Sequence, residues 1–384
     1  MHAPRRPPIP PPLRAGSTGS ARGSASGAAT GAIPPPLRPG PAGRVLRRLD
    51  GVVRSPRGFR TFRARLAVQG FFAFFCLLLG WRFAGFVAAA RAGAAELPAR
   101  PTGVDAFLPI GGLVGLFDWL RNGRLNAVHP AATILLLLFL ATAFLLRKSF
   151  CSWICPIGAL SDALARLGRR LFGRNFRPPM ALDVPLRAVK YGLLAFFVYV
   201  VAGMPAPLLA SFVQSDYNRI ADVKMYLFFA RAGAATFVVL GVLAAASVLV
   251  QGAWCRYLCP YGALIGIFGR FSPVKVRRDA AKCTDCGVCD RVCPARLPVS
   301  KSAAVASFEC TGCLDCLASC PARGALSVGT KRRRFGAPLF AALLLALFFA
   351  GWGAARLAGV WENRVPAADY RLLVPRAEQL AHPR

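Results

Sequence analysis

Five long apolar runs divide the chain and predict its architecture. They cover these residues: 66–90, 129–147, 188–210, 232–253 and 336–355. Each run is close to the roughly 20 residues that an α-helix needs to cross a bilayer, and the second run is the shortest. The pattern predicts a mainly α-helical fold with a multi-helix transmembrane domain of about five helices.

The segments between and beside the runs differ in their density of basic residues. Three of them are rich in Lys and Arg: 44–65, 147–190 and 256–335. Three others mix acids with fewer bases: 91–128, 211–231 and 356–384. Because basic connections stay in the cytoplasm, we expect the N-terminus inside and the C-terminus outside. The chain should then cross a bacterial inner membrane several times.

The composition agrees with a membrane protein. Of the 384 residues, 55% are hydrophobic and 17% are charged, which is too apolar for a soluble protein of this length. The formal charge of +33 could instead indicate nucleic-acid binding. However, bases such as Arg60, Arg63 and Arg65 gather beside an apolar run, where anchors to the membrane surface are expected. We therefore expect a membrane and no nucleic acid as a partner.

The segment 1–43 differs from the rest of the chain. It consists mainly of Pro, Gly, Ser, Ala and Arg, and it cannot bury enough apolar surface to offset the entropy of ordering, so we expect a disordered tail. We divide the remainder into three parts: a transmembrane domain with four helices over 44–275, a cysteine-rich domain over 276–330, and a fifth helix with a short outer tail over 331–384.

Eight cysteines in the cysteine-rich domain form two copies of one pattern. The copies are Cys283-x2-Cys286-x2-Cys289-x3-Cys293-Pro294 and Cys310-x2-Cys313-x2-Cys316-x3-Cys320-Pro321. This spacing is typical of bacterial two-cluster ferredoxins, in which the fourth cysteine of each copy ligates the other cluster. It predicts an inserted α+β ferredoxin module that holds two [4Fe–4S] clusters.

The spacing also assigns the cluster ligands. One cluster takes Cys283, Cys286, Cys289 and Cys320, and the other takes Cys310, Cys313, Cys316 and Cys293. Zinc is the alternative metal, but zinc sites do not require the x2-x2-x3-Pro rhythm twice. A disulfide scaffold is disfavoured because it suits small secreted domains.

A shorter cysteine motif also occurs twice, each time directly after an apolar run. Its copies are Cys151-x3-Cys155-Pro156 and Cys255-x3-Cys259-Pro260. The i,i+4 spacing predicts that both sulfurs of a copy lie on one helical face. A short interfacial helix is expected behind each copy.

The four cysteines of these copies should converge at the cytoplasmic surface of the membrane. There they could hold a further cluster, bind a soft metal such as Cu(I), or form a reversible dithiol pair. The alternative is that they are small apolar residues that pack helix ends.

His129 also has two interpretations. It is either a cap or anchor at the outer membrane surface or the acceptor of the proton that a quinol releases when it is oxidised.

These features resemble those of the NapH/NosR-type membrane polyferredoxins over about residues 60–330. The resemblance rests on the eight ferredoxin cysteines and the two Cys-x3-Cys-Pro copies, in the family's order. It implies electron transfer between the quinol pool and an unidentified redox protein, with quinol as a further ligand. We expect an electron-transfer component, such as a quinol dehydrogenase subunit, rather than a stand-alone enzyme.

Two further points qualify the resemblance. Some relatives handle copper during cytochrome-oxidase assembly, so a metal-handling reductase or an assembly factor for a respiratory complex is the alternative function. Ser152 stands where relatives commonly have glycine, and Leu108 stands where many have a cysteine. The sequence carries no Cys-x2-Cys-His haem site and no G-x-G-x-x-G fingerprint, so other molecules must supply the terminal donor and acceptor.

Overall fold

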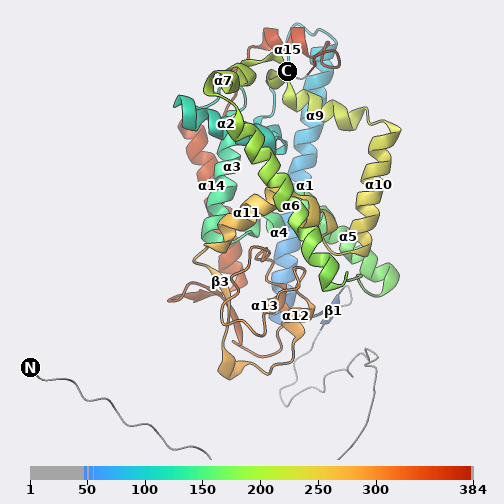
Figure 1. Ribbon diagram of the computed structural model, residues 1–384, viewed down its shortest axis with the longest axis vertical. Helices are drawn as coiled ribbons and strands as arrows, with labels where there is room; N and C mark the ends of the chain where they lie inside the picture. Colours follow the sequence, from blue (N-terminus) through green and yellow to red (C-terminus); the bar gives the residue numbers. More distant parts are fainter. Residues whose placement is uncertain (1–46, 50–51, 55, 382–384) are drawn as a thin grey trace, which may run out of the picture. The chain divides into compact units, whose positions relative to one another are not determined.

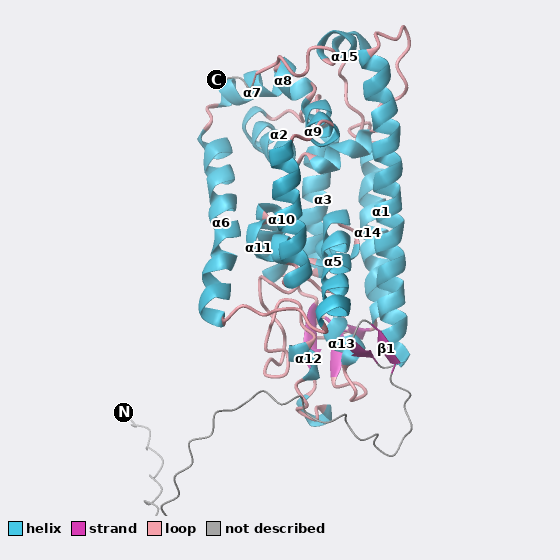
Figure 2. Cartoon of the chain, turned by 90° about the vertical axis from the view of Figure 1, so that its right-hand side faces the viewer, coloured by secondary structure: helices cyan, strands magenta, loops and turns pink. Residues whose placement is uncertain are grey.

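The computed structural model describes residues 47–49, 52–54 and 56–381. The expected disordered tail, 1–43, lies outside these residues. Within them, five helices run between the two ends of the helical domain (Figures 1 and 2): α1 (Pro56–Arg91), α3 (Pro130–Leu146), α6 (Met180–Gly203), α10 (Ala234–Leu249) and α14 (Ala337–Leu357). They follow the five predicted apolar runs, and the mainly helical fold is confirmed.

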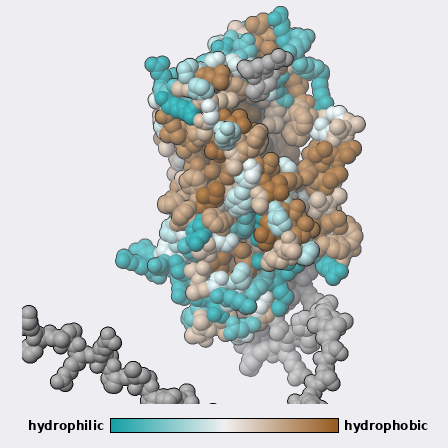
Figure 3. Space-filling view, viewed as in Figure 1, coloured by the Kyte–Doolittle hydropathy of each residue, from teal (hydrophilic) through white to brown (hydrophobic). Residues whose placement is uncertain are grey.

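The helices differ in their ability to span a bilayer. Three are long and apolar enough on their own: Gly58–Arg91, Met180–Gly203 and Ala337–Leu357. The helices α9 (Ala221–Ala230) and α10 are long and apolar enough only when taken together, and the pair is bent by 83°. Helix α3 has 17 residues and packs among the other helices, with most of its side chains buried. Figure 3 shows apolar side chains over the helical region and polar ones towards its ends.

Two of the expected runs have different limits in the structure. The run 188–210 is divided, because α6 ends at Gly203 and α7 (Ala206–Gln214) begins after Pro205. The residue before a proline is disfavoured in the helical conformation, which explains the break after Met204. The run 232–253 is shorter than expected because α10 ends at Leu249 and a π-helical turn, η2 (Trp254–Leu258), follows.

Short helices close the end of the domain where the C-terminus lies: η1 (Thr102–Phe107), α2 (Pro109–Asn122), α7, α8 (Asp216–Arg219), α9 and α15 (Ala367–Leu373). An apolar core holds this end together, with Phe86 of α1, Val223 of α9 and Tyr370 of α15 all buried in it. The Lys224 ammonium donates to the carbonyls of Ala377 and Leu380, which fastens the segment after α15 to α9.

The opposite end carries the motif helices and the ferredoxin module. The motif helices are α4 (Ser149–Trp153), α5 (Pro156–Phe172), η2 and α11 (Pro260–Arg270). The module contains an antiparallel sheet in the order β3-β4-β5, from β3 (Lys275–Arg278), β4 (Leu326–Gly329) and β5 (Arg334–Phe335), with η3 (Ala280–Lys282), α12 (Val288–Arg291) and α13 (Asp315–Ser319). A separate hairpin of β1 (Arg47–Leu49) and β2 (Val52–Arg54) precedes α1.

The module and the membrane helices share one apolar core. Val276 and Leu314 of the module are buried in the same cluster as Trp153 of α4 and Phe340 of α14. Arg65 of α1 is also buried, and it bonds to the module through the Asp315 carboxylate at 3.1 Å. The expectation that Arg65 is a membrane-surface anchor is therefore wrong, because the half-buried Asp315 of the module partners it instead. The module is packed onto the helices and is not tethered by a linker alone.

Candidate functional site

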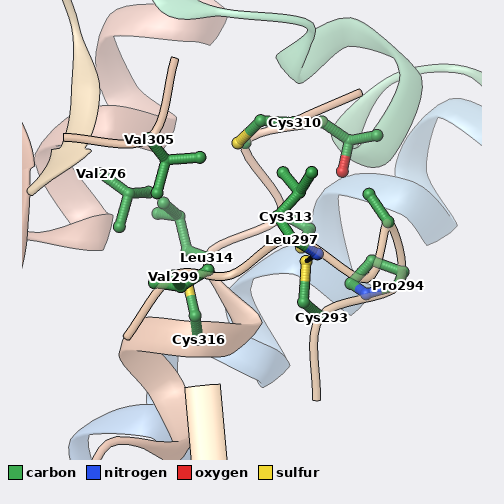
Figure 4. Close-up of a pocket in the computed structure, with 13 residues that line it drawn as sticks. Val276, Cys293, Pro294, Leu297, Val299, Val305, Cys310, Cys313, Leu314 and Cys316 are labelled. Atoms are coloured by element: carbon green, nitrogen blue, oxygen red, sulfur yellow. Dashed lines mark hydrogen bonds between the residues drawn. The ribbon is translucent and has the colours of Figure 1, made fainter. Parts of the chain in front are cut away.

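Four cysteines surround a cavity in the ferredoxin module: Cys293, Cys310, Cys313 and Cys316 (Figure 4). We call them the inner set. The other walls of the cavity are mainly apolar, with Leu297, Val299 and Val305 among them. Cys293 comes from the first copy of the pattern and the other three from the second, so the structure brings together the cysteines that the spacing groups.

The other four cysteines of the module also lie near one another: Cys283, Cys286, Cys289 and Cys320. We call them the outer set. Burial raises the pKa of the Cys320 thiol, and the charges of Cys286 and Cys283 raise it further. Burial likewise raises the pKa of Cys289 to about 12, with Asp290 and Cys320 adding to the rise. Cys320 therefore lies within electrostatic reach of all three cysteines from the first copy, as the crossed pattern requires.

The two halves of the module share a strained backbone shape. Asp285 and Leu314, neither of them glycine, adopt the left-handed conformation, with φ values of 46° and 62°. Gly287 and Gly312 adopt it as well. Each half thus places a left-handed residue directly before its second cysteine and another directly after it. Such strain persists only where the surrounding structure enforces it, and it turns the chain tightly around the position that the cysteines face.

The donor chemistry of these sets fits an iron–sulfur cluster. All described cysteines are free thiols, and in the described residues no group of three or more His, Cys, Asp or Glu side chains converges on a single metal ion. A cubane of four irons is larger than one ion, so its cysteines stand farther apart. Thiols buried in apolar surroundings stay protonated unless a metal holds them as thiolates.

The two Cys-x3-Cys-Pro copies have the same local structure. The first cysteine lies on a short helical segment, α4 for Cys151 and η2 for Cys255, and the second is the residue before the next helix. Cys155 and Cys259 have extended backbones and precede α5 and α11. In both copies the amide of the second cysteine donates five residues back, from Cys155 to Phe150 and from Cys259 to Trp254.

The expectation that both sulfurs of a copy lie on one helical face is therefore wrong. The proline after the second cysteine starts a new helix and forces an extended conformation on the residue before it. This break places Cys155 and Cys259 at helix N-termini. A helix N-terminus stabilises a thiolate, because unpaired amides and the helix dipole favour negative charge there. The Gly262 amide donates to Cys259 Sγ at 3.3 Å.

The four cysteines of these copies, Cys151, Cys155, Cys255 and Cys259, lie within electrostatic reach of one another. We call them the membrane set. Burial raises the pKa of the Cys151 thiol to about 12, with Cys155 and Cys259 adding to the rise and Lys148 opposing it. Burial also raises the pKa of Cys255, and the other three thiols add to that rise. The buried Lys148 lies beside these four thiols.

Both copies also touch the loops that carry the inner set. The Ser152 hydroxyl donates to the Thr311 carbonyl at 2.8 Å, and Trp153 Nε1 donates to the Gly312 carbonyl at 3.1 Å. From the second copy, Arg256 Nη1 donates to the Pro294 carbonyl at 2.6 Å. These carbonyls lie next to Cys310, Cys313 and Cys293. Ser152 therefore contributes a bond that glycine could not make.

Buried ion pairs reinforce this junction, and sequence reasoning missed them. Asp183 of α6 accepts from Arg256 Nη2 at 2.7 Å and from the Tyr257 hydroxyl at 2.6 Å. Lys190 Nζ donates to Glu309 Oε2 at 2.6 Å, next to Cys310. The only signal in the sequence was a charged residue inside an apolar run or inside the motif, such as Lys190 or Arg256.

His129 lies at the other end of the helical domain and is fully buried. Its Nε2 donates to the Asn218 carbonyl at 2.7 Å, and its Nδ1 lies 3.2 Å from Asp105 Oδ1. Burial lowers the pKa of His129, but Asp105 more than offsets this effect and the net pKa is raised. Anchoring at the membrane surface is therefore wrong for this residue, because its partners are protein groups. It occupies the N-cap position of α3, as one of the two interpretations expected, although its side chain makes no capping hydrogen bond.

Comparisons with known proteins agree with these sites. A family model described as a 4Fe-4S binding domain matches twice, over 128–175 and 232–279, so each match contains one Cys-x3-Cys-Pro copy. A second model, described as a 4Fe-4S dicluster domain, matches 275–325 and contains all eight cysteines of the inner and outer sets. No solved structure matches the chain closely.

Several curated proteins are similar to the chain. The putative electron transport protein YccM of Escherichia coli is 45% identical over 291 residues, which cover 74% of this chain and 82% of YccM. The ferredoxin-type protein NapH of Haemophilus influenzae is 32% identical over 40% of this chain and 49% of its own length. The regulatory protein NosR of Pseudomonas aeruginosa is 30% identical over 64% of this chain and 30% of its own length.

Proposed function

Since the chain belongs to the NapH/NosR family of membrane polyferredoxins, we propose that it relays electrons between the quinol pool and a redox protein that docks on the ferredoxin module. As a member of this family, the chain is a membrane protein that transports electrons and contains iron–sulfur sites. The proposal adds the quinol and the route through the chain. The observation that carries it is the direct bonding of both membrane motifs to the loops of the inner set.

We assign two [4Fe–4S] clusters to the module. Cys310, Cys313, Cys316 and Cys293 would hold one, and Cys283, Cys286, Cys289 and Cys320 would hold the other. Such clusters supply reversible one-electron oxidation and reduction. The chain supplies an apolar, water-poor wall for the inner set and a more open setting for the outer set, where the Asp285 side chain is exposed.

The membrane set, Cys151, Cys155, Cys255 and Cys259, is proposed as a third redox site. The match of each copy to a 4Fe-4S binding model favours a cluster over the other two candidates, Cu(I) and a dithiol pair. The N-termini of α5 and α11, next to Cys155 and Cys259, and the ammonium of Lys148 would stabilise the negative charge of such a group. Electrons would then pass from the membrane set to the inner set and from the inner set to the outer set, which is nearest to water.

The proposed setting is the bacterial inner membrane, with the cysteine sites on the cytoplasmic side. Lys and Arg are concentrated in the connections at the end of the domain that carries the cysteines, which supports this orientation. Quinol would be oxidised within the membrane domain, and the soluble partner would meet the outer set. The alternative, a metal-handling reductase or assembly factor, predicts a Cu(I) ion in the membrane set and no reduction by quinol.

The decisive experiment is an anaerobic purification of the full chain followed by reduction with a quinol analogue. We expect quinol to reduce the clusters of the module in the parent protein. Replacing Cys155 or Cys259 with serine should block this reduction while the iron of the module stays at about eight atoms per chain. The double substitution should cost little beyond either single one, because members of one functional unit are not additive.

Cys76 is a control for the loss of a nearby thiol, since it lies in α1 outside every motif but within electrostatic reach of Cys155. The Cys76→Ser protein should be reduced by quinol at the parent rate. If the serine variants of the membrane set are also reduced at the parent rate, these cysteines only pack the helix ends. Copper bound at one atom per chain in place of iron in that set would support the alternative function.

A further inference from the structure

A basic groove lies at the edge of the sheet of the ferredoxin module, at the foot of the membrane helices. It forms between the residues after α11, the start of β3 and the loop from β4 to β5. Its walls include Phe271, Lys275, Arg277, Thr330, Lys331 and Arg332. In the sheet, Lys275 pairs with Gly329 and Gly329 pairs with Arg334, so the groove lies at the end of the sheet where β4 turns into β5.

The positive charges of this groove are not neutralised by the protein. None of the described residues that line it is acidic, and no salt bridge in the described part of the chain involves Lys275, Arg277, Lys331 or Arg332. Burial lowers the pKa of Lys275. Four neighbouring cations lower it further: Arg147, Arg270, Arg277 and Lys331. The groove therefore holds a positive potential that an anion would relieve.

The position of the groove next to a helix that can span a bilayer indicates which kind of anion it would bind. Thr330, Lys331 and Arg332 precede α14, whose first residue is Ala337 and which is one of the helices apolar enough to span a bilayer. Phe271 stands at the end of α11 with 66% of its surface exposed. An exposed aromatic ring beside unpaired bases at a membrane surface matches an amphiphile with an anionic headgroup.

We propose that this groove binds the phosphate headgroup of an anionic phospholipid, with the acyl chains directed past Phe271 into the bilayer. An acidic protein partner is less suited to this place, because a redox partner must approach the outer set. The outer set begins beyond Arg278, at the opposite end of β3. The bound lipid would fix the height of the module at the membrane surface.

The test uses the detergent-solubilised full chain and native mass spectrometry with two short-chain lipids, a phosphatidylglycerol and a phosphatidylcholine. We expect the parent protein to retain the phosphatidylglycerol preferentially. The triple variant Lys275→Gln, Lys331→Gln and Arg332→Gln should bind it about 100-fold more weakly, since each base near an anionic lipid surface contributes about fivefold. The iron content of each variant reports whether the module is still folded.

A matched triple variant removes three exposed bases elsewhere on the same module: Lys282→Gln, Lys301→Gln and Arg323→Gln. It should bind the phosphatidylglycerol as the parent does. Equal loss in both triple variants would mean that only net charge matters and would overturn the proposal. Displacement of the lipid by millimolar inorganic phosphate would instead identify a site for the free anion. Equal retention of both lipids by the parent, or unchanged binding by the groove variant, would also refute it.

Discussion

Lys148 is the residue whose charge should matter most to the membrane set. It is buried, and its ammonium lies 3.4 Å from the Cβ position that a side chain at Gly262 would have, beside Cys259. A buried positive charge favours the more negative, reduced form of a neighbouring redox group. We expect Lys148→Met to lower the reduction potential of this site by at least about 60 mV, a tenfold change in the equilibrium constant.

The measurement is a redox titration followed by electron paramagnetic resonance, with Lys148→Arg as the control that keeps the charge. The arginine variant should stay close to the parent potential. An unchanged potential in Lys148→Met, with iron content intact, would show that the redox group of the membrane set lies elsewhere.

His129 should make the stability of the outer end depend on pH. The bonds from Nε2 to Asn218 and from Nδ1 to Asp105 need protons on both ring nitrogens, and Asp105 raises the pKa of the ring. A group whose pKa is higher in the folded than in the unfolded protein stabilises the folded state when it is protonated. For His129 this stabilisation is fully present below the unfolded pKa of about 6.5, and it is lost as the pH rises through the folded pKa.

We therefore expect the Tm difference between the parent and His129→Gln to be largest at low pH and to shrink in alkaline buffer. Thermal unfolding of the solubilised proteins between about pH 5 and pH 9 measures it. A Tm difference that stays constant over this range would show that the imidazole is neutral in the folded protein.

The cysteine residues could be grouped from the sequence, whereas their surroundings could not. The x2-x2-x3 spacing determines which cysteines can ligate the same cluster. It therefore assigned Cys293 and Cys320 each to the cluster of the other copy. The burial of Lys148 and Arg256 depends on contacts with α11 and α6, which are distant in sequence. No local pattern distinguishes such residues from bases at the membrane surface.

Among the helical elements, α5 depends on a close approach at Gly158. A Cβ atom at this position would lie 1.9 Å from the Cys151 carbonyl oxygen, which is backbone and cannot turn aside. We expect Gly158→Ala to destabilise the protein by about 1–3 kcal/mol, as overpacking does, and to reduce the metal content of the membrane set. Thermal unfolding and iron analysis measure the two effects.

Gly192 of α6 is the matched control, because a Cβ atom there would meet nothing within 4 Å. Gly192→Ala should leave both the metal content and the Tm unchanged or slightly improved, since alanine favours a helix. Similar losses in the two alanine variants would contradict the proposed contact between α4 and α5.

The sequence located the elements better than it located their ends. Apolar length identified α1, α6 and α14, because a bilayer requires a minimum helix length. It placed the start of a run at 232, directly after Arg231, but it could not give the 83° bend between α9 and α10. The direction of a chain after such a break is set by packing against neighbouring helices.

At the scale of the whole molecule, the path of the helices makes a prediction about topology. The five helices alternate in direction, so both Cys-x3-Cys-Pro copies and the ferredoxin module share one end and α15 lies at the other. We expect reporter fusions made after Thr330 and at the C-terminus to report opposite compartments, with the first in the cytoplasm. Matching compartments would mean that α14 does not cross the membrane.

The fastening of α15 to α1 and α9 has a consequence for biosynthesis. Residues of α15 leave the ribosome after every helix that they cover, and α14 must carry them across the bilayer before they can reach Phe86 and Val223. The cysteine end needs only the chain as far as α14. Closure of the far face therefore has to wait until α15 has been synthesised and has crossed the bilayer, whereas packing of the cysteine end does not depend on α15.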